Sequence, residues 1–170
     1  ESCNKLNFQQ TYRMRLDLNS AGQISAKTFP IEDITNITSL IWAKDILGKD
    51  AVMQSFNSLL RHKVTLRKMY DLAWQEAEKI GGFDAIFTNE LGYVTEGGRS
   101  NIFIRKNSQW MTPPLTSGCL PGIMRSILLK DPEWSALEKN ITIEDVLTSD
   151  EVILTNALRG VIRLTVDNKL

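Results

Sequence analysis

Lys63 and Glu96 are the two side chains of this 170-residue sequence whose types and surroundings point most clearly to chemistry. Lys63 lies in Arg61-His-Lys-Val-Thr-Leu-Arg67, just before a stretch with helical periodicity, and Glu96 lies in Val94-Thr-Glu-Gly-Gly-Arg-Ser-Asn-Ile-Phe103. A lysine amine can form an imine with an aldehyde, and a carboxylate can keep a heterocyclic nitrogen protonated. Together they are the minimum protein equipment for pyridoxal phosphate chemistry.

Two other positions indicate where a phosphate group could bind. In the segment 112–125, which is rich in proline and glycine, a helix is expected to begin, and the first amides of a helix leave their N–H groups free for an anion. The backbone amides of Ile123 and Met124 are therefore candidate phosphate ligands. Asn156 and Ala157 follow a predicted strand, where a side-chain amide and a backbone amide could complete the site.

Each of these residues also has an ordinary alternative. Most lysines lie on the surface, a glutamate at a strand end is often solvated, and a proline before a helix needs no ligand to explain it. Ser100 and Asn101 are candidates to support the carboxylate of Glu96, although an asparagine here can also serve only to shape a turn. The pattern as a whole favours a catalytic Lys63 over a surface lysine.

Arginines recur close to these motifs, at positions 67, 99, 125 and 159. Arg125 is expected in the first turn of its helix, in contact with a neighbouring loop. Arg99 and Arg159 adjoin the candidate cofactor positions, so they are candidates to bind the carboxylates of a dianionic substrate. Solvation at the surface is the alternative for each of them.

The composition excludes several classes of function. Twenty basic residues balance twenty acidic ones, so no field is expected to attract nucleic acid or an anionic membrane. Cys3 and Cys119 belong to no CxxC pair and His62 is the single histidine, so neither a disulfide framework nor a metal centre is expected. No apolar run reaches membrane-spanning length, and we expect a soluble, cytoplasmic protein with a small-molecule substrate.

The pattern of apolar residues and turns predicts an α+β fold in which these residues lie at the ends of strands and helices. A hairpin is expected at 11–29, and a domain boundary near Ile31 separates residues 1–31 from 32–170. Helices are expected at 50–60, 66–79, 122–129 and 143–148, and strands at 37–42, 85–89, 93–96, 101–105, around Trp110, and at 152–155 and 161–166.

The four motifs, around Lys63, around Glu96, at 112–125 and at 156–157, follow one another along the chain as they do in the class IV aminotransferase family. The chain resembles this family over nearly its whole length. The resemblance implies fold type IV, with pyridoxal phosphate bound as an imine on Lys63, Glu96 on the ring nitrogen, and the segments at 123–124 and 156–157 at the phosphate. It also implies a homodimer. Family members carry a small domain ahead of the large one, and by this comparison residues 1–31 contain only the last hairpin of that domain.

Within the family, the motifs resemble the lyase branch most, in particular the lyase domain fused to an aminodeoxychorismate synthase component. The resemblance is carried by His62-Lys-Val-Thr65, Glu96-Gly-Gly-Arg-Ser-Asn101, Thr112-Pro-Pro-Leu115 and Asn156-Ala-Leu-Arg-Gly160, and by the 33 residues from Lys63 to Glu96. It implies conversion of 4-amino-4-deoxychorismate to 4-aminobenzoate and pyruvate, a step of folate biosynthesis. Two alternatives stay open: a transaminase for branched-chain or D-amino acids, and a non-catalytic fragment of a larger synthase.

Overall fold

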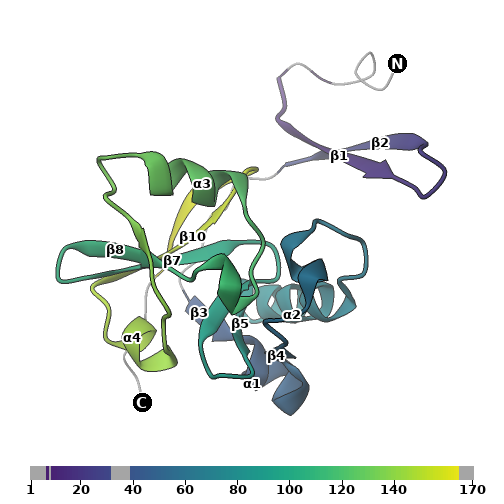
Figure 1. The fold of residues 1–170 in the computed structure, drawn as a ribbon. Helices are drawn as coiled ribbons and strands as arrows, with labels where there is room; N and C mark the ends of the chain where they lie inside the picture. The colour runs from purple at the N-terminus through teal and green to yellow at the C-terminus, as the bar shows by residue number, and fades with distance from the viewer. Residues whose placement is uncertain (1–6, 8, 32–38, 165–170) are drawn as a thin grey trace. The chain divides into compact units, whose positions relative to one another are not determined.

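The computed structural model describes residues 7, 9–31 and 39–164, and its contacts divide the chain into residues 1–35 and residues 36–170. In the first unit, strand β1 (Tyr12–Leu18) pairs antiparallel with β2 (Ile24–Pro30), as predicted (Figure 1). Asn19 closes the turn, because its side-chain oxygen accepts the N–H groups of Ala21 and Gln23. The assignment of this hairpin to a small domain stays a prediction.

Strand β5 (Gly82–Asn89) is the centre of the first sheet of the second unit and is buried along nearly all its length. It pairs in parallel with β3 (Ser39–Trp42) and β4 (Val52–Met53), and antiparallel with β6 (Val94–Gly97). Such burial explains the run of apolar residues in β5.

The second sheet has five strands in the order β11-β10-β7-β8-β9. They are β7 (Asn101–Lys106), β8 (Gln109–Thr112), β9 (Leu137–Glu138), β10 (Glu151–Asn156) and β11 (Gly160–Leu164). Helix α3 (Ile123–Lys130) covers this sheet, with Leu128 packed against Phe103 and Ile153. The short helix α4 (Ile143–Leu147) begins with a capping box between Thr142 and Asp145.

Helix α2 (Lys68–Lys79) packs against β5 (Figure 1). Its buried residues are Tyr70, Ala73 and Ala77, whose spacing places them on one face. The small alanines let the helix approach the strand closely, and Gly81, with φ of 86°, ends it. The predicted helix at 66–79 is thus confirmed, and its N-terminal end follows the segment that carries Lys63.

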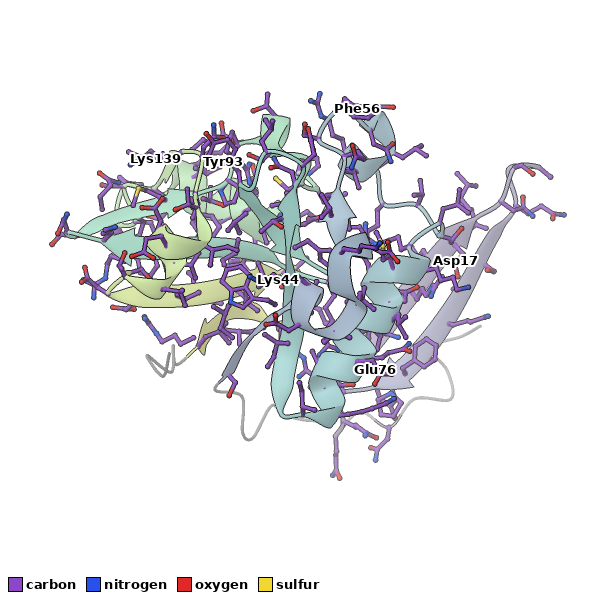
Figure 2. All side chains as sticks on the ribbon, turned by 90° about the horizontal axis from the view of Figure 1, so that it is seen from below. Asp17, Lys44, Phe56, Glu76, Tyr93 and Lys139 are labelled. Atoms are coloured by element: carbon purple, nitrogen blue, oxygen red, sulfur yellow. The ribbon has the colours of Figure 1, made fainter. Side chains whose placement is uncertain are left out.

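The helix predicted at 50–60 is wrong. A 3₁₀ turn (η1, Gly48–Asp50) and strand β4 are followed by a loop and a second 3₁₀ turn (η2, Ser58–Arg61), while the short helix α1 (Ala43–Leu47) lies before them. Long-range contacts decide this: β4 pairs with β5, and the Glu90 carboxylate accepts the N–H and hydroxyl of Ser55. Phe56 is 80% exposed on this loop (Figure 2).

The other predicted strands and helices agree with the structure to within a few residues, as far as it describes them, and the mixed sheets with packed helices confirm the α+β class. Residues 37–38 and 165–166 of the predicted strands lie outside the described residues. Among the described helices, none is both long and apolar enough to span a membrane.

Candidate cofactor site

A cavity of about 430 Å³ brings most of the predicted site residues together. Its wall includes Lys63, Glu96, Arg67, the strand ends at 100–101 and 155–157, and the turn at 120–123. These segments come from both sheets and from the beginnings of α2 and α3. The cavity therefore lies between the two sheets of the second unit.

Lys63 lies between η2 and α2, in a segment shaped by turns. The N–H of Val64 donates to the carbonyl of His62, and that of Arg67 to the carbonyl of Thr65. The Lys63 side chain lines the open cavity and is exposed to solvent there. The surrounding protein still lowers its pKa, through partial desolvation and then the charge of Arg67, against the opposing effect of Glu96. A lowered pKa increases the fraction of neutral, nucleophilic amine.

Glu96 lies in β6, is only 2% exposed, and is held by donors from two other elements. The hydroxyl of Tyr70 donates to Oε1 and the N–H of Leu120 donates to Oε2, each over 2.9 Å. Burial raises the pKa of Glu96 to about 7, although both hydrogen bonds and the charge of Arg67 lower it. Such a carboxylate is poised to be stabilised in its ionised form by a cation inside the cavity.

Asn101 connects Glu96 to the turn before α3. Its amide nitrogen donates to the carbonyl of Leu120 over 2.9 Å and lies 3.5 Å from Glu96 Oε2. A Cβ atom added to Gly122 would lie 2.0 Å from the Asn101 Oδ1. A side chain at position 122 would therefore displace the Asn101 side chain or the turn, and glycine lets the two lie this close together.

Ser100 was expected to support Glu96, but no hydrogen bond joins the two side chains in the described part of the chain. Its hydroxyl donates instead to Asp84 Oδ2 over 2.6 Å. The Asp84 carboxylate also accepts the N–H groups of Ala85, Gly98 and Arg99, so the loop from β6 to β7 wraps around it. Burial raises the pKa of Asp84, and these hydrogen bonds oppose that rise.

Asp84 thus positions the loop between Glu96 and Asn101, although its role was missed in the sequence. The available signal was a single aspartate within the apolar run Phe83-Asp-Ala-Ile-Phe87. A charged side chain in a buried strand needs several hydrogen bonds, so it marks a polar anchor rather than a random substitution.

Helix α3 begins with free backbone donors, as the sequence predicts. Gly122 is its N-cap and provides no side-chain acceptor. Within residues 39–164, no acceptor is found for the N–H groups of Ile123 and Met124. Ile123 lines the cavity, whereas the Met124 side chain packs into the apolar cluster under α3, so Met124 can offer only its backbone.

Asn156 shapes the turn after β10. Its side-chain oxygen accepts the N–H groups of Leu158 and Arg159, and its amide nitrogen donates to the carbonyl of Arg99. The side chain is therefore engaged in structure, whereas Ala157 is exposed in the cavity wall. The neighbouring Thr155 is fully buried and lines the cavity, and its hydroxyl has no hydrogen-bond partner among the described residues. Thr155 was not singled out in the sequence.

The arginines have different surroundings from those expected. The Arg99 guanidinium donates to the Phe83 carbonyl and to Glu78, and lies over the rings of Trp74 and Phe83. These contacts engage it in structure, although Arg99 still borders the cavity. Arg159 is half-buried in the turn before β11 and is not part of the cavity wall.

Arg125, in contrast, contacts the neighbouring loop as predicted. Its guanidinium donates to the carbonyl of Pro113 over 2.8 Å and pairs with Glu138. The side chain is buried beneath α3. Arg125 therefore joins α3 to the loop at Pro113 and to Glu138 of β9, and it does not line the cavity.

The donor set fits pyridoxal phosphate. An aldehyde-bearing pyridine requires an amine with a lowered pKa and a buried carboxylate, here Glu96, which forms no ion pair with any residue that the structure describes. The free amides at the start of α3 and the partnerless hydroxyl of Thr155 are suited to a phosphate group. Pyridoxal phosphate would provide a binding partner for each of these groups: an aldehyde for the amine, a protonated ring nitrogen for the carboxylate, and phosphate oxygens for the amides and the hydroxyl.

Comparisons with known proteins agree with this fit. The sequence profile of amino-transferase class IV matches residues 12–166. A D-alanine aminotransferase of Bacillus licheniformis is 33% identical over 150 residues, which cover 84% of this chain and 50% of the relative. An aminodeoxychorismate lyase of Bacillus subtilis is 28% identical over 177 aligned residues, covering 95% of this chain and 60% of the relative.

A solved structure shows the same architecture. The branched-chain aminotransferase of Thermoproteus uzoniensis, determined with norvaline, superposes with a TM-score of 0.69 at 25% identity, over 86% of this chain and 50% of that one. The chain thus spans about half to three fifths of the length of these relatives. The relatives include both transaminases and a lyase.

Proposed function

The chain belongs to the class IV aminotransferase family, whose enzymes depend on pyridoxal phosphate, and we propose that the protein that carries it is the lyase that forms 4-aminobenzoate and pyruvate from 4-amino-4-deoxychorismate. The observation that carries the proposal is the presence of Lys63 and Glu96 in the wall of one cavity. Two observations support the lyase within the family. The residues of the motifs resemble those of the lyase branch, and the alignment with the B. subtilis lyase covers 95% of this chain.

Lys63 has two tasks in this proposal. Its amine, whose pKa is lowered by desolvation and by the charge of Arg67, would hold the cofactor. With substrate bound, Lys63 would take the proton from the amine-bearing carbon as a general base. Bound pyridoxal phosphate supplies an aldehyde carbon and an electron-accepting ring.

Glu96 keeps the ring nitrogen protonated. The carboxylate is fixed by Tyr70 and by the N–H of Leu120, so it cannot turn away from its site without losing both hydrogen bonds. A cation bound beside it would lower its pKa from about 7 and keep it ionised at neutral pH. Asn101 and Gly122 hold the turn before α3 against Glu96, which links this end of the site to the amides of Ile123 and Met124.

In the lyase reaction, removal of the proton is followed by loss of the enolpyruvyl ether. The carbon–oxygen bond breaks, the proton is returned to the leaving group, and pyruvate departs. The remaining ring becomes aromatic 4-aminobenzoate, and no water is consumed. Aromaticity makes this step effectively irreversible.

A transaminase is the second candidate, and the D-alanine aminotransferase relative, at 33% identity, supports it. Both reactions need the same tasks from Lys63 and Glu96, but a transaminase leaves the amino group on the cofactor. The test is to give the cofactor-loaded protein 4-amino-4-deoxychorismate and, separately, leucine or D-alanine. The lyase proposal expects pyruvate and 4-aminobenzoate in equal amounts; release of neither product, with full conversion of the cofactor to its amino form by an amino acid, would show a transaminase.

A non-catalytic fragment is the third possibility, because the chain spans only part of its relatives. An absorbance band on addition of pyridoxal phosphate that disappears in Lys63→Ala would argue against it, because such a fragment is expected to hold no stable cofactor. The homodimer and the cytoplasmic location also stay predictions. Light scattering of the protein tests the first, and fractionation of cells tests the second.

A further inference from the structure

The loop between β6 and β7 is anchored on one side by the buried carboxylate of Asp84. The backbone N–H groups of Gly98 and Arg99 donate to it over 2.8 and 2.9 Å, and the Ser100 hydroxyl donates over 2.6 Å. Asp84 lies in β5, is 2% exposed and is not part of the cavity wall. Its carboxylate therefore holds the loop from behind the cavity.

The carbonyls of the same loop bind two other segments of the chain. The Gly98 carbonyl accepts a hydrogen bond from the Arg67 guanidinium over 3.1 Å, and the Arg99 carbonyl accepts one from the side-chain amide of Asn156 over 3.2 Å. Arg67 is the N-cap residue of α2, which packs against the first sheet, whereas Asn156 ends β10 of the second sheet. The loop thus joins two parts of the cavity wall that are far apart in the sequence.

The loop has little room to move between Asp84 and α2. A Cβ atom added to Gly97 would overlap the Asp84 carboxylate, and one added to Gly98 would lie 2.6 Å from the backbone carbonyl oxygen of Tyr70. Two consecutive glycines therefore let the backbone pass between the carboxylate and the helix. Any shift of this backbone would carry both carbonyls with it.

Both wall segments contain groups of the candidate cofactor site. Lys63 lies shortly before Arg67, in the segment that leads into α2. In the other segment, the side-chain oxygen of Asn156 accepts two backbone N–H groups of its turn, and Ala157 is exposed in the cavity wall. A displaced loop would therefore disturb the cavity at two places.

We propose that Asp84 is a positioning residue for the cofactor: through the two loop carbonyls, it fixes the start of α2 and the turn at 156–157 in the cavity wall. The inference rests on the proposed function, since it assumes that the cavity binds pyridoxal phosphate. A buried carboxylate is stable only when hydrogen-bond donors compensate it, and here the loop supplies those donors.

Asp84→Asn tests this role without changing the size of the side chain. One carboxylate oxygen becomes an N–H₂ group, which must face the N–H of either Gly98 or Arg99, so the loop is expected to move away. Gly98→Ala is a second variant, which displaces the loop but leaves the Asp84 carboxylate intact. Asp145→Asn is the matched control, because Asp145 also accepts a backbone N–H and a hydroxyl, both from Thr142 and outside the cavity wall.

Amide hydrogen exchange of the cofactor-free protein measures whether the effect reaches the wall. In Asp84→Asn, peptides covering 64–71 and 155–160 should exchange about 5-fold to 10-fold faster than in the wild type, as expected for the loss of one hydrogen bond. A peptide from β8 is the internal reference for global unfolding, and Asp145→Asn should leave both wall peptides unchanged. An increase confined to residues 83–101 would show a purely local structural role and overturn the proposal.

Binding of pyridoxal phosphate then tests the positioning itself. Its dissociation constant, from absorbance titration, should rise about 10-fold to 100-fold in Asp84→Asn and Gly98→Ala, the range found when residues that orient ligand-binding groups are replaced. Asp145→Asn should keep the wild-type value. Faster exchange in the wall with unchanged affinity would also overturn the proposal.

The two proposals fail in different ways. If the wild-type protein binds pyridoxal phosphate but forms no 4-aminobenzoate, the lyase proposal fails and the result for Asp84 still holds. Absence of cofactor binding to the wild-type protein would overturn both. Thermal unfolding of each variant is recorded, and if Asp84→Asn does not unfold cooperatively, the same two measurements on Gly98→Ala decide.

Discussion

The Tyr70 hydroxyl donates a hydrogen bond to Glu96 Oε1 over 2.9 Å, which ties helix α2 to strand β6. Burial raises the pKa of Tyr70, so the phenol remains protonated and can only act as the donor towards the carboxylate. Tyr70 follows Lys63 by seven residues. The same segment therefore supplies the candidate nucleophile and a hydrogen bond that fixes its partner carboxylate.

Tyr70→Phe should shift the pH dependence of activity. The hydroxyl lowers the pKa of Glu96, so its removal raises that pKa, and the acidic limb of the profile moves to higher pH. A shift of about one to two pH units is expected, since a hydrogen bond to a charged acceptor contributes about 1.5–3 kcal/mol. Tyr93→Phe, at a half-buried tyrosine outside the cavity, is the control and should leave the profile in place.

Glu96→Gln should separate stability from function. The folded-state pKa of Glu96 is raised from 4.5 to about 7, so the folded protein binds the proton more tightly than the unfolded chain. Its contribution to stability is present below about pH 4.5 and is lost as the pH rises to about 7, by up to about 3 kcal/mol. The cofactor-free Gln variant should therefore gain stability relative to the wild type as the pH rises from 5 to 8, in urea unfolding, while losing activity. A difference that does not change with pH would contradict the burial argument.

Thr155→Val should weaken cofactor binding without weakening the fold. The hydroxyl is buried and has no partner among the described residues, so its removal relieves an unsatisfied group and stability should be unchanged or higher. The affinity for pyridoxal phosphate should fall, by about 10-fold if one hydrogen bond is lost. Thr112→Val is the matched comparison, because the Thr112 hydroxyl donates to Ile102 over 2.7 Å; that variant should lose about 1 kcal/mol of stability.

Gly122→Ala should disturb the site through Asn101. The added methyl group would lie 2.0 Å from the Asn101 side-chain oxygen, so either the side chain or the turn before α3 must move. Cofactor affinity is expected to fall more than about 10-fold. In an Asn101→Ala background the same substitution should have a much smaller effect. Equal effects in the two backgrounds would show that the close contact is not the cause.

Local sequence patterns predicted the elements that have clear periodicity. Helix α2 and strands β5 to β8 follow from apolar spacing and from turn residues such as Gly81 and Gly92. The segment 50–60 was mispredicted because its structure depends on distant partners, β5 for β4 and Glu90 for Ser55. A pattern within the segment contains no information about either contact.

The site residues also divide into those that a local motif identifies and those whose role depends on distant contacts. The motifs identified Lys63 and Glu96, and the structure lines one cavity with both. The bond from Ser100 to Asp84, the engagement of Arg99 by Glu78, and the bond from Arg67 to Gly98 all depend on which residues become neighbours after folding. Thr155 could not be found either, because its significance lies in a missing partner.

The most direct test of the account is the location of the cofactor. The protein is loaded with pyridoxal phosphate and reduced with borohydride, and its peptides are mapped by mass spectrometry, with Lys63→Ala and Lys68→Ala treated in parallel. Attachment of the pyridoxyl group to Lys63, retained in Lys68→Ala and lost in Lys63→Ala, is the predicted result. A loaded protein that carries the group on another lysine would contradict the account.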